Sequence, residues 1–145
     1  MEVSFYQIAD DNLVPSVVRL LEKVYATEKR CIFFSPLEDR VKLVDKTLWT
    51  FSTNAFIPHG DKSLGYAEQQ PIYFTDEFEN PNSATVVVMM DSFDYKSFNC
   101  DWEKILFVFG ESEPEQAVVL YHDLKKNQEN VNYWKQSSKG WEKLV

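Results

Sequence analysis

The sequence predicts an α/β fold, with a mostly parallel sheet, helices on both faces and a Rossmann-like outline without a phosphate-binding loop. Short, continuous apolar runs, which are typical of strands buried on both faces, alternate with amphipathic helical segments. The chain has 145 residues, of which 44% are hydrophobic and 15% aromatic. That is enough for one core without disulfide bonds, so we expect a single domain over residues 1–145.

The first third of the chain predicts two strand–helix pairs. Residues 3–8 are rich in β-forming side chains, and residues 14–25 place apolar side chains on one helical face that ends near Lys29. Residues 31–34 form an apolar run expected in a buried strand. The motif Ser35-Pro36-Leu37-Glu38 predicts a capping box that opens a second helix. The apolar positions of that helix are Leu37, Val41, Val44 and Leu48.

The middle of the chain predicts three more strands. Residues 71–74 form a short one, and residues 84–90 form the strongest one, which we expect in the middle of the sheet, ended by Asp91. Residues 93–102 predict a short helix, and residues 104–109 predict the next strand.

The last part of the chain predicts a helix and a final strand. Ser112-Glu113-Pro114-Glu115 is a second expected capping box, and residues 127–130 are an expected turn. Residues 131–134 predict a short last strand, followed by a polar tail. The buried face of this late helix is expected to carry Ala117, Val118, Tyr121 and Leu124.

The formal net charge of −8 argues against a general nucleic-acid binder, because phosphate contacts need clustered lysine and arginine. Residues 125–145 hold five lysines and two glutamates, a balance of +3, so residues 1–124 carry −11. The basic tail is either a solvated terminus or a site for an acidic partner peptide.

Residues with catalytic or metal-binding chemistry are few. The chain has four glycines and no glycine-rich phosphate loop, and His59 and His122 are its only histidines. Two isolated cysteines form neither a zinc site nor a disulfide framework. We therefore expect no metal and no cofactor. No signal peptide and no membrane-spanning apolar run is recognisable, so we expect a soluble, cytoplasmic protein.

Residues 48–60 carry Trp49, Phe51 and Phe56 beside the turn-forming Pro58-His59-Gly60. We expect the helix to end here and an aromatic loop to begin. Loops are normally polar, because a buried loop leaves backbone groups without partners. Such a loop is either folded back onto the core or offered to a partner, since tryptophan and tyrosine lead the residue types that anchor interfaces.

Three motifs together carry a family resemblance: Leu48-Trp49-x-Phe51, Phe56-Ile57-Pro58-His59-Gly60 and Gln70-Pro71-Ile72. With them, the whole chain resembles the chi subunit of bacterial DNA polymerase III. The resemblance implies a non-catalytic accessory subunit that acts in DNA replication as part of a DNA-directed DNA polymerase complex. It implies two partners, the psi subunit of the clamp loader and the acidic C-terminal tail of single-stranded-DNA-binding protein. It implies no direct DNA binding and no membrane association.

The resemblance also implies where the two partners bind. Trp49, Phe51, Phe56, Pro58 and His59 match the family's aromatic surface, which is expected to face psi or another protein that uses this patch, such as an accessory helicase. The family's basic residues at the start of the last long helix are replaced here by Glu113-Pro114-Glu115-Gln116. The expected tail site therefore combines an apolar pocket for a terminal Pro-Phe with displaced basic residues: Phe107, Val108, Tyr121, Lys125 and Lys126.

An alternative interpretation is a small α/β enzyme or nucleotide-binding domain that uses His59 and nearby carboxylates. Its ligand would lie at the carboxyl ends of the parallel strands. A tightly bound nucleotide or metal in the purified protein would favour the enzyme. Loss of a protein complex in a folded Trp49→Ala variant would favour the adaptor.

Overall fold

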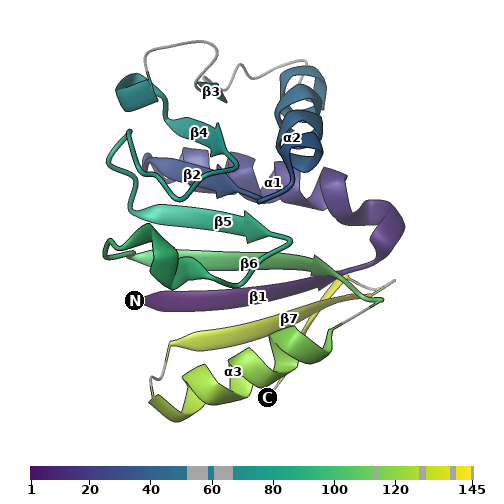
Figure 1. Cartoon of the computed structure of the whole chain (residues 1–145). Coiled ribbons are helices and arrows are strands. Elements are labelled where there is room, and N and C mark those ends of the chain that lie inside the picture. Colours follow the sequence, from purple (N-terminus) through teal and green to yellow (C-terminus); the bar gives the residue numbers. More distant parts are fainter. Residues whose placement is uncertain (52–58, 61–66, 113, 128–129, 138–139, 145) are drawn as a thin grey trace.

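The computed structural model describes residues 1–51, 59–60, 67–112, 114–127, 130–137 and 140–144. These residues contain an eight-stranded sheet in the order β3-β4-β2-β5-β6-β1-β7-β8 (Figure 1). The strands are β1 (Glu2–Ile8), β2 (Cys31–Phe34), β3 (His59–Gly60), β4 (Ile72–Thr75), β5 (Val86–Met90), β6 (Lys104–Gly110), β7 (Val131–Ser137) and β8 (Gly140–Leu144). Neighbouring strands are parallel except β7 and β8, which are antiparallel.

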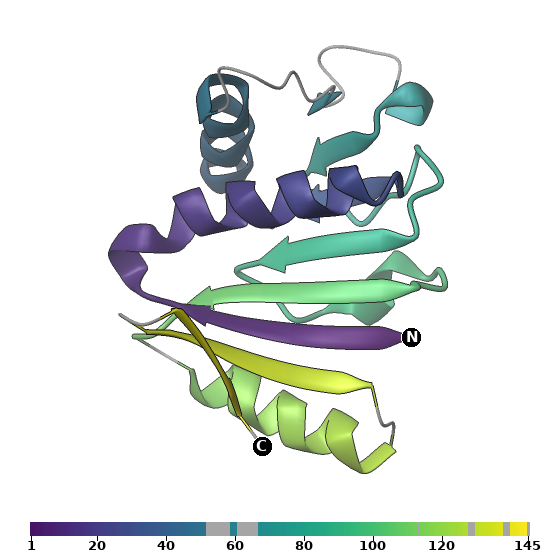
Figure 2. The ribbon, with the colours of Figure 1, turned by 180° about the vertical axis from the view of Figure 1, so that it is seen from behind.

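The three α-helices lie on both faces of the sheet, so the predicted α/β class is confirmed. The helices are α1 (Leu13–Ala26), α2 (Glu38–Phe51) and α3 (Glu115–Asn127). The buried side chains of α1 and α2 share one apolar cluster with one face of the sheet, and those of α3 share a second cluster with the other face. Figure 2 shows α1 lying across its face, with α3 behind the sheet.

The strand β5 lies in the middle of the sheet between β2 and β6, as predicted. All five of its residues are buried, because helices cover it on both sides. Alternate residues point to opposite faces, so Val86, Val88 and Met90 join the α1 cluster while Val87 and Met89 join the α3 cluster.

The predicted capping box at Ser35 is wrong in its details. The helix α2 begins at Glu38, and the carbonyl of Leu37 accepts the first helical bonds from Arg40 and Val41. The Ser35 hydroxyl accepts a hydrogen bond from the Leu37 N–H and donates one to the Asp91 carboxylate. Asp91 lies 56 residues further along the chain, so no local pattern could indicate this partner.

The predicted end of the same helix is also wrong. Residues 48–51 continue α2, so Trp49 lies on a helix and not in a loop. The hydroxyls of Thr47 and Thr50 donate to carbonyls one turn earlier in the helix, which satisfies these polar groups within the helix itself. The helical period therefore continues through the aromatic residues.

In the second half of the chain, the short helix predicted within residues 93–102 is found, whereas the predicted cap of α3 differs from the structure. The segment 93–102 contains a short 3-10 helix, Tyr95–Phe98, whose Phe98 is buried with Trp102 against the α3 face of the sheet. The hydroxyl of Ser112, expected to cap α3, donates instead to Asp10 after β1.

The polar tail forms the edge strand β8, which the sequence analysis missed. It pairs antiparallel with β7 and places Trp141 opposite Gln136 and Lys143 opposite Trp134. The ring of Trp141 meets Tyr6 edge-on at 5.5 Å, and the Lys143 ammonium lies 5.6 Å from the Trp134 ring centre. The Trp141 contact packs β8 against β1, whereas the Lys143 contact stabilises the β7–β8 hairpin itself.

Candidate protein-interaction sites

Trp49 is the predicted interface residue that the structure places most clearly. Its side chain is 45% exposed on α2, whereas its neighbour Leu48 is 4% exposed in the core. Trp49 follows Leu48 directly, which turns it about 100° around the helix axis, so it points away from the core stripe of Val44 and Leu48. Figure 1 shows that this end of α2 and the edge strand β3 lie at the same side of the molecule, beyond β4.

The other members of the predicted aromatic surface are placed in part. Phe51 is the last residue of α2, and His59 lies in β3 in register with Ile72 of β4. Phe56 and Pro58 lie outside the described residues, as do the side chains of Phe51 and His59. The backbone therefore brings two of the predicted positions, 49 and 51, to one helix end and a third, 59, to the adjacent sheet edge.

The residues of the predicted tail site lie partly at the surface and partly in the core. Tyr121 of α3 is 7% exposed and meets Tyr133 edge-on at 5.4 Å and Phe5 at 5.9 Å. Phe107 is fully buried beneath it in the same apolar cluster. Phe107 can therefore support the position of Tyr121, but it has no exposed surface to offer a peptide.

Val108 lies on the opposite face of the sheet from Tyr121. It belongs to the cluster under α1, because consecutive residues of a strand point to opposite faces. The structure thus does not bring Phe107 and Val108 to one pocket. The period of two residues along a strand is a signal that could have separated them from the sequence.

The two lysines at the end of α3 differ in their surroundings. The Lys125 ammonium donates to the Val131 carbonyl at 3.2 Å and so ties the end of α3 to the start of β7. Lys126 is exposed in the last helical turn, next to His122 one turn earlier. Cations are favourable at this end of a helix, so both lysines stabilise α3 whatever else they do.

A groove of about 770 Å³ along the first half of α3 was missed by the sequence analysis. Its walls are the segment 91–94 after β5 and the outer face of α3. Val119, which is 62% exposed, is one of its lining residues, between Glu115 and Asp123 along α3. The regular spacing of Glu115, Val119 and Asp123, four residues apart on a helix, is the signal that could have indicated one continuous face.

The carboxyl ends of the parallel strands carry carboxylates that are paired with hydroxyl groups. Asp91 after β5 accepts from Ser35 at 2.8 Å, and its carboxylate lies 3.2 Å from Arg40 Nε. Asp10 after β1 accepts from Ser112 at 2.6 Å. A side chain at Gly110 would meet Asp10 at 2.1 Å, so the chain passes close to this carboxylate. Negative charge at this edge opposes a phosphate where an α/β nucleotide site would lie.

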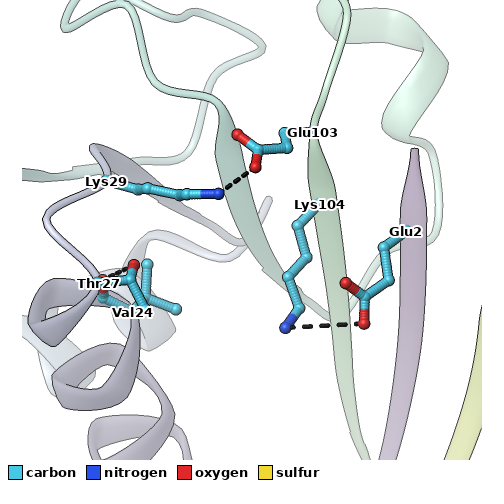
Figure 3. Close-up of polar contacts among 6 residues, drawn as sticks. All are labelled: Glu2, Val24, Thr27, Lys29, Glu103 and Lys104. Carbon is cyan, nitrogen blue, oxygen red and sulfur yellow. Dashed lines mark hydrogen bonds and ion pairs between the residues drawn. The ribbon is translucent and has the colours of Figure 1, made fainter.

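The amino ends of the strands carry a smaller cavity of about 260 Å³ between α1 and the sheet. Figure 3 shows Lys29 directed at Glu103, and Lys104 directed at Glu2, whose oxygen lies 3.9 Å from the ammonium. The hydrogen bond from Lys29 holds the pKa of Glu103 below its usual value. Thr27, at the end of α1, donates to the Val24 carbonyl at 2.6 Å. The Lys29 contact links the segment after α1 to the start of β6, the Lys104 contact links β6 to β1, and the Thr27 contact closes the helix end.

Neither a metal centre nor a membrane span is found within the described part of the chain. None of its His, Cys, Asp and Glu side chains form a group of three or more that could hold a metal ion. Among the same residues, no helix is long and apolar enough to cross a bilayer. Burial raises the pKa of the Cys31 thiol to about 12, which makes this a structural core residue and a poor nucleophile.

Comparison with known proteins agrees with the resemblance carried by the aromatic motifs. The family described as "DNA polymerase III chi subunit, HolC" matches residues 1–130. A protein of Rickettsia prowazekii (strain Madrid E), named "Probable DNA polymerase III subunit chi", is 31% identical over 126 residues, which cover 87% of this chain and 72% of the relative. The chain therefore belongs to the family of DNA polymerase III chi subunits, which act in DNA replication.

Proposed function

We propose that the chain is a non-catalytic adaptor of the DNA polymerase III holoenzyme. One surface, around Trp49, binds the psi subunit and thereby the clamp loader. A second surface, at the end of α3, binds the acidic C-terminal tail of single-stranded-DNA-binding protein. The adaptor thus connects the clamp loader to protein-coated single strands.

The observation that carries the proposal is the exposure of Trp49 at the end of α2. Tryptophan is strongly enriched among the residues that dominate binding energy, and a partner that covers the exposed 45% of Trp49 would remove a large aromatic surface from water. The edge strand β3, which holds His59, lies at the same side and can extend the contact surface. Each buried aromatic anchor contributes ~2 kcal/mol or more to such an interface.

The tail site rests on weaker support, because its charges are few. Lys126 is exposed and Lys125 is in part committed to the Val131 carbonyl. Opposite charge chiefly raises the association rate and the specificity of a complex. We therefore expect tail binding that depends steeply on salt and that involves Lys126 more than Lys125.

Co-purification with a psi subunit tests the first surface. Trp49→Ala should abolish the complex, whereas Leu43→Ala should leave it intact. Leu43 is a matched control, because it is an apolar residue of the same helix with a similar exposed fraction, 48%, on the other flank. Equal loss in both variants, or in neither, would contradict the assignment of the surface to Trp49.

Fluorescence anisotropy of a labelled acidic peptide that ends in Pro-Phe tests the second surface. Saturable binding at low salt that requires the terminal Phe and weakens in Lys126→Glu supports the tail site. Lys23→Glu is the matched control, because Lys23 is exposed in the last turn of α1, on the opposite face of the sheet. Absence of binding at low salt would mean that this chain has lost the tail contact, and the Trp49 surface would then carry the adaptor role alone.

A further inference from the structure

The groove along α3 is lined by apolar side chains together with acidic side chains. Its lining includes the exposed Val119, the partly buried Leu120 and Phe93, and four carboxylates. Those carboxylates belong to Asp91, Asp94, Glu115 and Asp123, and among the described residues no lysine, arginine or histidine lines the groove.

The charges in this groove are largely uncompensated. Of its four carboxylates, only Asp91 forms an ion pair with a described residue, Arg40. Asp94 accepts a hydrogen bond from the neutral Ser97 hydroxyl at 2.6 Å. Clefts that carry one sign of charge concentrate ligands of the opposite sign.

The position of Val119 indicates that the ligand also has an apolar part. Val119 is 62% exposed, the largest exposed fraction among the large apolar side chains described. It lies between Glu115 one turn earlier and Asp123 one turn later, so charges flank an apolar centre along α3. The partner that fits carries cations on both sides of one apolar side chain.

We propose that this acidic groove docks a lysine- or arginine-rich segment of another protein, with a single apolar side chain that covers Val119. The segment lies along α3, with cations facing Glu115 and Asp123, and a further cation facing Asp94. A nucleic acid is repelled by the same carboxylates. A symmetric second copy of this chain would set the four carboxylates against themselves.

The inference is independent of the proposed adaptor role, because the two partner peptides have opposite charge. An acidic tail is attracted to Lys126 and repelled by the groove, whereas a basic segment behaves in the opposite way. Failure of one binding test therefore leaves the other unaffected.

The experiment is fluorescence anisotropy with a labelled synthetic peptide that has lysines at both ends and a leucine at its centre. Two further peptides replace the lysines by glutamates, or the leucine by serine. We expect saturable binding of the first peptide at low salt, weaker binding without the leucine and none without the lysines.

Variants of the groove locate the site. Glu115→Gln with Asp123→Asn should raise the dissociation constant about fivefold, and Val119→Ser about threefold. A control variant, Asp39→Asn with Glu142→Gln, removes the same charge from exposed positions on α2 and β8 and should bind like wild type. All these side chains are exposed, so thermal unfolding followed by circular dichroism should show an intact fold.

Several results would overturn the proposal. One is unchanged binding in both groove variants, and another is equal weakening in the control, which would assign the attraction to the net charge of the whole chain. Failure of the lysine peptide to bind at low salt would also refute it. A wild-type dimer in sedimentation equilibrium that disappears in Val119→Ser would assign the groove to a second copy instead.

Discussion

Substitutions of Asp91 test how the carboxyl edge of the sheet is held together. Asp91 has a φ of 62°, a left-handed conformation that asparagine, aspartate and glycine adopt more readily than other residues. Its side chain is 22% exposed, accepts from Ser35 at 2.8 Å and lies 3.2 Å from Arg40 Nε. We expect the free energy of unfolding to fall in the order wild type, Asp91→Asn, Asp91→Gly, Asp91→Ala.

The magnitudes follow from the separate contributions. Both Asp91→Gly and Asp91→Ala lose the charged hydrogen bond and the ion pair, about 1.5 kcal/mol together. Asp91→Ala adds about 1–2 kcal/mol of backbone strain, whereas Asp91→Gly adds about 0.4–1 kcal/mol through the entropy of the unfolded chain. Asp91→Asn keeps an acceptor for Ser35 and a tolerated backbone, so its loss should be about 0.5–1 kcal/mol.

Urea denaturation followed by tryptophan fluorescence and circular dichroism measures these differences. The double variant Ser35→Ala with Asp91→Gly, compared with the two single variants, isolates the contribution of the hydroxyl–carboxylate bond, because glycine removes the acceptor and tolerates the φ of 62°. If Asp91→Ala were as stable as Asp91→Gly, the argument from backbone strain would be refuted. If Asp91→Asn were as unstable as Asp91→Ala, the charge rather than the conformation would dominate.

Three further predictions concern the two cysteines and the lysines of α3. Cys31 is buried, which raises its pKa to about 12, whereas Cys100 is exposed. A thiol reagent at pH 8 should therefore modify one cysteine in the native chain and two in urea. Rapid modification of both cysteines in the native chain would contradict the burial of Cys31. The Cys31 thiol ionises near pH 9 in the unfolded chain and near pH 12 in the folded chain, so Cys31 lowers the free energy of unfolding as the pH rises from 9 to 12. Urea titrations of wild type and Cys31→Ala over this pH range would show a decrease in wild type that the variant lacks. Lys125→Met should lower the free energy of unfolding by about 1 kcal/mol, because it removes the hydrogen bond to the Val131 carbonyl, whereas Lys126→Met should change it little. If urea denaturation ranked the two variants in the reverse order, the hydrogen bond of Lys125 would not form in solution.

The sheet and its two faces could be predicted because their signals are local. The run from Val86 to Met90 reads as a doubly buried strand, and the spacing of Ala117 and Tyr121 gives the buried face of α3. Such periodic patterns depend only on neighbours in sequence. Strand order is a long-range property and could not be predicted in this way.

Both helix starts were misassigned for the same physical reason. Each predicted capping serine donates to a distant carboxylate, Ser35 to Asp91 and Ser112 to Asp10. The parallel sheet brings these groups to one edge, where a hydroxyl finds a charged acceptor. The strand β8 was missed although its partner β7 directly precedes it, because residues 140–144 include charged side chains and form no apolar run, as is common in edge strands.

The sequence is least informative about a candidate site where packing determines whether a side chain is exposed. Trp49 and Leu48 are adjacent apolar residues, and only the packing of α2 on the sheet separates the exposed one from the core. Phe107 and Val108 were assigned to one pocket, although the alternation of a strand places them on opposite faces. A sequence period thus assigns a residue to one face of an element, whereas the exposed fraction of its side chain depends on packing contacts that are distant in sequence.

Helix stability explains only some of the charged side chains along α3. Glu115 in the first turn and Lys125 and Lys126 in the last are favourable with the helix dipole, so helix stability alone accounts for them. It does not account for Asp123, which lies beyond the first turn and gains nothing from the dipole. Nor does it account for Val119, which exposes 62% of its surface between the two carboxylates. The proposed basic segment would place a cation beside the Asp123 carboxylate, and its apolar side chain would cover Val119 and remove it from water.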